Sequence, residues 1–149
     1  AGAPGGYTSS QRQVVEMLRQ NSRPYLFSNS LAPSIAGASL AALDLLKSSS
    51  DLLTKLRENT EYFRSEMTRR GFEIPESDHP IVPVMVGDAV KAAKMADAML
   101  AKGIYVRAFS YPVVPKGKAR IRTQMSAGLT REQLDKAIKA FEEARAEIG

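Results

Sequence analysis

Residues 119–125 read "ARIRTQM", and small or apolar side chains alternate with charged or polar ones along the whole stretch. Successive side chains of an extended strand point to opposite faces of a sheet, so this pattern predicts a strand with two unlike faces. One face carries Ile121, Thr123 and Met125. The other carries Arg120, Arg122 and Gln124. We therefore expect one face to join a core and the opposite face to present two arginines.

Further strands and helices are predicted on both sides of this strand. Residues 81–87, "IVPVMVG", read as a strand in which Pro83 marks a position that donates no backbone hydrogen bond. Residues 88–102 have a helical pattern, and residues 104–109, "IYVRAF", predict another strand. Thr130 is placed to cap a last helix. The apolar side of that helix carries Leu134, Ile138, Phe141 and Ile148. The second half of the chain thus predicts the order β-α-β-β-α.

The first half of the chain predicts helices. Residues 9–20 and residues 32–47 each carry apolar side chains at helical spacing. A third helix is expected to start from a cap at Ser50 or Asp51 and to end at Arg70. Its apolar stripe consists of Leu52, Leu56, Thr60, Phe63 and Met67. Together with the second half, these helices predict a long helical hairpin ahead of the strands.

These elements predict an α/β fold class, in which helices accompany a sheet. Residues 23–27, "RPYLF", are predicted to be extended, because the residue before a proline is pushed out of the helical region. Gly2, Pro4, Gly5 and Gly6 predict a loop at the start of the chain.

The composition is typical of an ordinary globular protein. The chain has 149 residues, 44% of them hydrophobic and 25% charged, and its formal net charge is +5. It contains no cysteine, which excludes disulfides and thiolate metal sites. No apolar run approaches the ~18 residues that span a bilayer, so no membrane partner is expected. The chain begins at Ala1 without a methionine, and we expect an N-terminal portion to be missing.

Few residues suggest acid–base or metal chemistry. The single histidine, His79, lies in a loop before a proline and is read as structural. The sequence has no glycine-rich phosphate loop, no HExxH motif and no acidic metal cluster, so no metal is expected. Residues 115–122, "PKGKARIR", carry four cations and no acid. That segment is either a patch for an anionic partner or a solvated strand end.

The run Ser28-Asn29-Ser30 precedes the helix predicted at residues 32–47. The free N–H groups of a helix start, together with hydroxyl and amide donors, form a ready anion site. Simple capping of the helix explains the same residues. Arg122 has two interpretations as well. An arginine held in a strand is a pre-organised fork for a carboxylate, and an exposed strand face with two solvated arginines is the commoner arrangement.

Four long, collinear motifs carry a resemblance that covers essentially the whole chain. They are "GGYT", "RQNSRPYLFSNSLAP", "DHPIVPVMVGDA" and "GIYVRAFSYPVVPKGKARIRTQMSA". They closely resemble the C-terminal part of the glycine C-acetyltransferases, also called 2-amino-3-ketobutyrate coenzyme A ligases. This family belongs to the α-oxoamine synthases. The resemblance implies the C-terminal small domain of the fold type I enzymes that use pyridoxal 5'-phosphate (PLP), an α/β domain of the α+β type with a mostly antiparallel sheet covered by helices. It also implies that residues 1–30 form an interdomain, active-site loop and linker segment, and that residues 31–149 form the small domain.

The resemblance also implies a reaction. Enzymes of this family are homodimers with active sites shared between subunits, and they condense glycine with acetyl-CoA to 2-amino-3-ketobutyrate and CoA, or catalyse the reverse cleavage in threonine degradation. PLP is the cofactor and acts as the electron sink. Ser28 and Asn29 correspond to the pair that reaches the cofactor phosphate of the partner subunit. Arg122 corresponds to the arginine that binds the amino acid's carboxylate. A cytoplasmic location is expected, or the mitochondrial matrix in a eukaryote.

Three features depart from the family pattern. The family's Schiff-base lysine would fall just before Ala1, so the chain alone is expected to be inactive, with no catalytic residue of its own. Leu129 stands where the family usually has histidine, and Arg107 and Ala108 stand where a neutral residue and glycine are expected. The alternatives are another α-oxoamine synthase, or a non-catalytic module that binds a polyanion. No nucleic-acid partner is expected, because the sequence lacks interleaved aromatic and basic residues.

Overall fold

The structure is a computed structural model that describes residues 5–27 and 30–149. The chain divides into two compact units, residues 1–50 and residues 51–149. All of the buried hydrophobic residues that the structure describes belong to the second unit. This second unit therefore has a core of its own. The domain division predicted after residue 30 stays a prediction.

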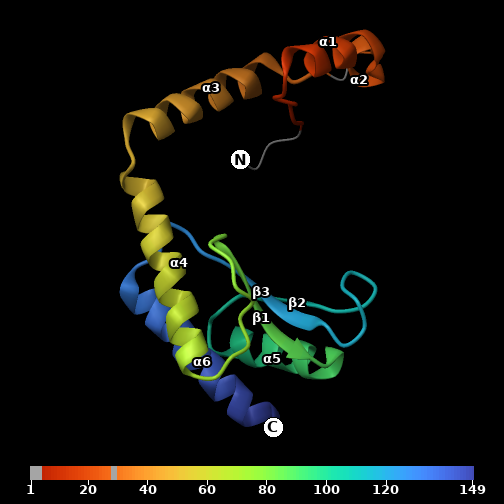
Figure 1. The fold of residues 1–149 in the computed structure, drawn as a ribbon. Coiled ribbons are helices and arrows are strands. Elements are labelled where there is room, and N and C mark those ends of the chain that lie inside the picture. The colour runs from red at the N-terminus through yellow and green to blue at the C-terminus, as the bar shows by residue number, and fades with distance from the viewer. Residues whose placement is uncertain (1–4, 28–29) are drawn as a thin grey trace. The chain divides into compact units, whose positions relative to one another are not determined.

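In its described residues, the first unit contains the helices α1 (Arg12–Asn21), α2 (Arg23–Leu26) and α3 (Pro33–Ser48) (Figure 1). The prediction that residues 23–27 are extended was wrong, because residues 23–26 form the short helix α2. Pro24 lies in the first turn of α2, where its missing N–H would have had no partner within the helix. The 16 residues of α3 include no buried side chain, although the helix is rich in leucine and alanine.

The second unit contains a three-stranded sheet of β1 (Ile81–Gly87), β2 (Arg107–Phe109) and β3 (Ala119–Gln124). The strand order is β1-β3-β2, and β3 pairs antiparallel with both neighbours. The prediction of a mostly antiparallel sheet is confirmed. Pro83 lies in the edge strand β1, opposite Arg122. The prediction that residues 104–106 belong to a strand was wrong, since only residues 107–109 pair with β3.

Three helices cover the sheet: α4 (Asp51–Arg69), α5 (Ala89–Ala101) and α6 (Arg131–Ile148). Helix α5 contacts all three strands, and α6 packs against α5 and α4 (Figure 1). Asp88 caps α5 by accepting a 2.8 Å hydrogen bond from the backbone N–H of Lys91. Thr130 and Gln133 form a reciprocal capping box at the start of α6, which confirms the predicted cap.

The core lies between the sheet and these helices. Phe141 of α6 is fully buried and makes edge-to-face contacts with Phe63, at 6.4 Å between ring centroids, and with Phe72, at 5.8 Å. The stripe predicted on α4 is buried from Thr60 onward, whereas Leu52 is 63% exposed. The sheet with its helical cover is the α+β arrangement expected from the sequence.

Candidate functional site

The central strand β3 positions Arg122. Ile121 and Thr123 are buried, while Arg122 and Gln124 are exposed, as the alternation predicts. The Thr123 hydroxyl donates a 2.8 Å hydrogen bond to the carbonyl oxygen of Val82 in β1. Because β3 is hydrogen-bonded on both sides and its inner face is packed, the backbone that carries Arg122 is held in place.

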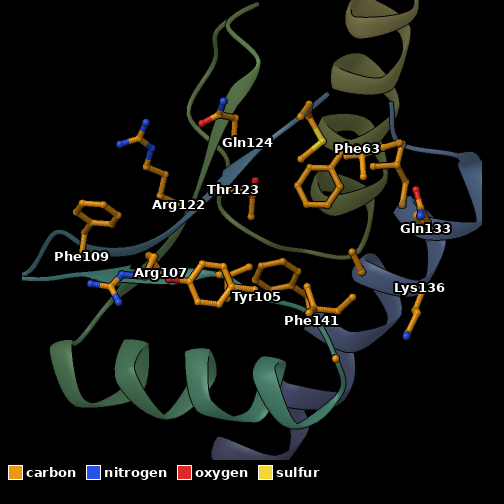
Figure 2. Close-up of a pocket in the computed structure, with 17 residues that line it drawn as sticks. Phe63, Tyr105, Arg107, Phe109, Arg122, Thr123, Gln124, Gln133, Lys136 and Phe141 are labelled. Carbon is orange, nitrogen blue, oxygen red and sulfur yellow. The ribbon is translucent and has the colours of Figure 1, made fainter. Parts of the chain in front are cut away.

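A cavity of about 590 Å³ opens where the pairing of β2 with β3 ends. Arg107 and Arg122 form the last pair of residues in register, and residues 104–106 continue beyond it without strand pairing. Figure 2 shows the two arginines at one end of this cavity and Phe63 with Gln133 at the other. Its apolar wall includes Phe63, Ile104, Val106, Met125, Leu129, Leu134, Ala137 and Phe141. The cavity therefore has an apolar interior and a polar, cationic mouth.

Arg122 is available for an anion at this mouth. Its guanidinium carbon lies 5.9 Å from the centroid of the Phe109 ring, at the limit of a cation–π contact. Among the residues that the structure describes, no carboxylate lies within ion-pair distance of it. A guanidinium presents parallel N–H donors that match the two oxygens of a carboxylate. The site can therefore bind a carboxylate with a defined orientation.

Arg120 has a different environment from Arg122, although both lie on the same face of β3. Arg120 pairs in register with Met85 of β1 and with Phe109 of β2. It is half-buried, and it does not belong to the cavity lining. The alternation of side chains could not distinguish the two arginines. The structure does, because Arg122 lies in the last β2–β3 pair, next to the cavity, and Arg120 does not.

Asn59 of α4 supports the turn that follows β3. Its side chain is 5% exposed, and its amide nitrogen donates hydrogen bonds of 3.0 Å to the carbonyl oxygens of both Ser126 and Leu129. The turn thereby places the half-buried Leu129 side chain in the cavity wall. Leu129 offers the cavity only an apolar surface. Sequence reasoning missed this role of Asn59, because its partners lie 67 and 70 residues later in the chain.

The predicted pair Ser28 and Asn29 lies outside the described residues. Helix α3, which follows the pair, has Ala32 at its N-cap position, and a methyl side chain accepts no hydrogen bond. The carbonyl oxygen of Ala32 accepts from the backbone N–H groups of Ile35 and Ala36, at 2.9 and 3.0 Å. The proposed phosphate contact of Ser28 and Asn29 stays a prediction.

His79 has a structural position. Its Nδ1 accepts a 3.0 Å hydrogen bond from the backbone N–H of Ile81, and its carbonyl oxygen accepts one of 2.9 Å from Arg64. The Arg64 guanidinium also donates to the carbonyl oxygens of Pro75 and Ile81. These contacts fix the loop that leads into β1. Sequence reasoning missed Arg64, because its partners are 11 to 17 residues away along the chain.

Two polar clusters lie along α4, and the first of them joins it to α6. The Tyr62 hydroxyl donates to Asp135, and this hydrogen bond is the main reason why the pKa of Tyr62 is raised. The Arg131 guanidinium lies 3.5 Å from the centroid of the same ring. Farther along α4, hydrogen bonds from Arg69 and Arg70 lower the pKa of Glu66 to about 2.

The described residues contain neither a membrane-spanning helix nor a cluster of metal ligands. Within residues 5–27 and 30–149, no helix is long and apolar enough to cross a bilayer. Over the same residues, no group of three or more His, Cys, Asp or Glu side chains could hold a metal ion.

Comparisons with known proteins agree with the sequence motifs. The chain is 53% identical over 148 residues to 2-amino-3-ketobutyrate coenzyme A ligase of Escherichia coli K12, a match that covers 99% of this chain and 37% of the ligase. It is 54% identical over 142 residues to the mitochondrial ligase of Mus musculus, covering 95% of this chain and 34% of that protein. The chain thus spans little more than a third of the length of these relatives.

A solved structure shares the fold. The structure of SPT with PLP superimposes with a TM-score of 0.86 at 29% sequence identity, over 94% of this chain and 36% of that chain. This likeness confirms the predicted fold class, the small domain of fold type I enzymes. The sequence model of the class I and II aminotransferases matches residues 1–141. The chain belongs to the aminotransferase class I and II family.

Proposed function

We propose that this chain serves a PLP-dependent acyltransferase that condenses glycine with acetyl-CoA to 2-amino-3-ketobutyrate and CoA, or runs the reverse cleavage in threonine degradation. The observation that carries the proposal is the placement of Arg122. Its exposed guanidinium has no carboxylate partner among the described residues, and it stands on a rigid strand at the mouth of a cavity. The identity to the E. coli ligase supports the choice of substrates.

Arg122 suits a small amino acid by its geometry. Two parallel N–H donors hold a carboxylate in one plane, and this fixes the direction of the bond that reacts at the α-carbon. The strand backbone under Arg122 is paired on both sides, so the fork is already oriented before the substrate arrives.

PLP, when bound, supplies the electron sink that stabilises a carbanion of the amino acid. In this proposal Ser28 and Asn29 bind the cofactor phosphate of the partner subunit, so the protein acts as a homodimer. The support is the family match and the position of the pair just ahead of α3. A cationic fork for a carboxylate fits the chemistry of an amino-acid substrate of this cofactor.

Two alternatives remain. Another α-oxoamine synthase would use the same fork with a different acyl-CoA, and the likeness to SPT at 29% identity is weaker than the likeness to the ligases at 53%. A non-catalytic module would instead use the basic segment at residues 115–122 for a polyanion, and its binding would depend strongly on salt. In that segment, Lys116 lies 5.2 Å from the centroid of the Tyr111 ring.

The location follows from the same proposal: the cytoplasm of a bacterium, or the mitochondrial matrix of a eukaryote. The experiment is an assay of the complete protein with PLP, glycine and a series of acyl-CoA thioesters, in which the released CoA thiol is measured. We expect turnover to be fastest with acetyl-CoA and glycine. Faster turnover with a long-chain acyl-CoA, or with an amino acid other than glycine, would show that another synthase activity is the correct one.

A further inference from the structure

Arg107 and Arg122 stand directly opposite each other on β2 and β3. Directly opposed residues of an antiparallel pair share one face of the sheet, and like charges in this position destabilise the pairing. Figure 2 shows the two guanidinium groups pointing away from each other. The strand register therefore brings two positive charges close together. Among the described residues, no ion pair offsets their repulsion.

Some cations of this unit are paired with acids, whereas others, Arg120 and Lys136 among them, have no acid within ion-pair distance among the described residues. Arg69 and Arg70 pair with Glu66, Arg70 also pairs with Glu142, and Lys102 pairs with Glu143 and Glu147. For Arg107 and Arg122, by contrast, no acid within ion-pair distance is found among the described residues. The positive charge of this pair is thus left for a ligand to neutralise.

The cavity next to the pair strengthens this conclusion. Both arginines and Lys136 line it, and no Asp or Glu does so among the described residues. The neutral side chains of Gln124 and Gln133 add hydrogen-bonding groups to the same lining. Three cations around one cavity without an acid create a positive potential that attracts anions.

We propose that Arg107 and Arg122 together form an anion site that prefers a small dicarboxylate to a monocarboxylate, with Arg107 as the residue that determines this specificity. The inference rests on the proposed function, in which Arg122 binds one carboxylate. The long stems of both arginines allow each guanidinium to turn toward a ligand at the cavity mouth. The second guanidinium then pairs with the second carboxylate, which glycine lacks.

The test compares two ligands with the same number of carbon atoms, succinate and butyrate. Each is titrated into the protein at low ionic strength, without PLP, and followed by NMR through the arginine Nε–H signals and the backbone signals of β2 and β3. We expect succinate to bind about fivefold more tightly than butyrate or better, because a second charge-assisted hydrogen bond is gained. Added salt should reduce the difference, since both guanidinium groups are exposed.

Three variants separate the possible explanations. Arg107→Gln should remove the preference for succinate while leaving butyrate affinity within about twofold, because Gln keeps most of the stem and loses the charge. Arg120→Gln is the matched control, since it removes an arginine from the same sheet face outside the cavity, and it should preserve the preference. Arg122→Lys should weaken both ligands.

The outcomes distinguish this inference from the proposed function. The arginine-pair site is overturned if succinate and butyrate bind the unchanged protein equally well, or if Arg107→Gln keeps the preference for succinate. In either case, the proposed role of Arg122 stands if Arg122→Lys still weakens the binding of both ligands. Unchanged binding of both ligands in Arg122→Lys overturns that role and the arginine pair with it.

Discussion

The side-chain amide nitrogen of Asn59 lies 3.0 Å from the carbonyl oxygen of Leu129, 70 residues later in the chain. A second 3.0 Å hydrogen bond from the same nitrogen reaches Ser126. One buried side chain thus closes the turn between β3 and α6 and fixes one wall of the cavity. The turn depends on α4 for its shape, although α4 contributes only Phe63 to the cavity lining.

Asn59→Ala should lower the free energy of unfolding by about 1–3 kcal/mol, because two carbonyl groups lose their donor at a buried position. Glu58→Ala, at the preceding exposed position of α4, is the control and should change stability by less than about 0.5 kcal/mol. Urea denaturation followed by circular dichroism measures both. Equal stability of the two variants would show that the Asn59 hydrogen bonds contribute nothing net.

Glu66 predicts a specific dependence of stability on pH. Its carboxylate accepts hydrogen bonds from Arg69 and Arg70, and its pKa in the folded protein is about 2, below the ordinary value of 4.5. A lowered folded pKa means that the stabilisation is fully present above the unfolded pKa and is lost as the pH falls toward the folded pKa. Glu66→Gln should therefore lower the melting temperature near neutral pH.

The difference in melting temperature between Glu66→Gln and the unchanged protein should shrink between about pH 5 and pH 2, because protonation removes the same charge in the unchanged protein. Thermal melts at a series of pH values measure this. Glu61→Gln, an exposed position on the same helix, provides the control. A difference that stays constant down to pH 2 would contradict the ion-pair origin of the effect.

The cofactor contact can be tested without measuring turnover. Changing Ser28 and Asn29 together to alanine should reduce PLP affinity of the complete protein about tenfold or more, since hydrogen bonds to a charged phosphate contribute about 1.5–3 kcal/mol each. Ser34→Ala, in the first turn of α3, is the matched control and should leave the affinity unchanged. Titration with PLP, followed by its absorbance, gives both values. Unchanged affinity in a folded double variant would contradict the phosphate-binding role of the pair.

Local chemistry in the sequence was enough to predict most of the elements. The alternation in residues 119–125 identified β3 and its two faces, because side-chain direction in a strand depends only on position. Thr130 and Asp88 mark helix starts, because the side chain of each accepts a hydrogen bond from the backbone N–H three residues later. The helix at residues 23–26 was missed, since a proline favours an extended residue before it and is equally acceptable in a first helical turn.

The features that define the candidate site depend on contacts across the chain. Residues 104–106 have a strand-like sequence, yet they lie outside the paired strand, because the pairing of β2 with β3 begins only at Arg107, and nothing local signals where it begins. The cavity, the opposition of Arg107 and Arg122, and the role of Asn59 all follow from tertiary pairing of distant segments. A sequence pattern could nominate Arg122 as a candidate, but only the register shows which arginine meets the cavity.

The most direct measurement is the steady-state kinetics of Arg122→Lys and Arg120→Lys in the complete protein, with glycine and acetyl-CoA as substrates. Lysine keeps the charge and loses the fork, so Arg122→Lys should reduce kcat/KM about 100-fold, equivalent to about 3 kcal/mol of transition-state stabilisation. Arg120→Lys, outside the cavity, should reduce it far less. Equal, small effects of the two substitutions, or a larger loss at Arg120, would contradict the assignment of Arg122 as the carboxylate-binding residue.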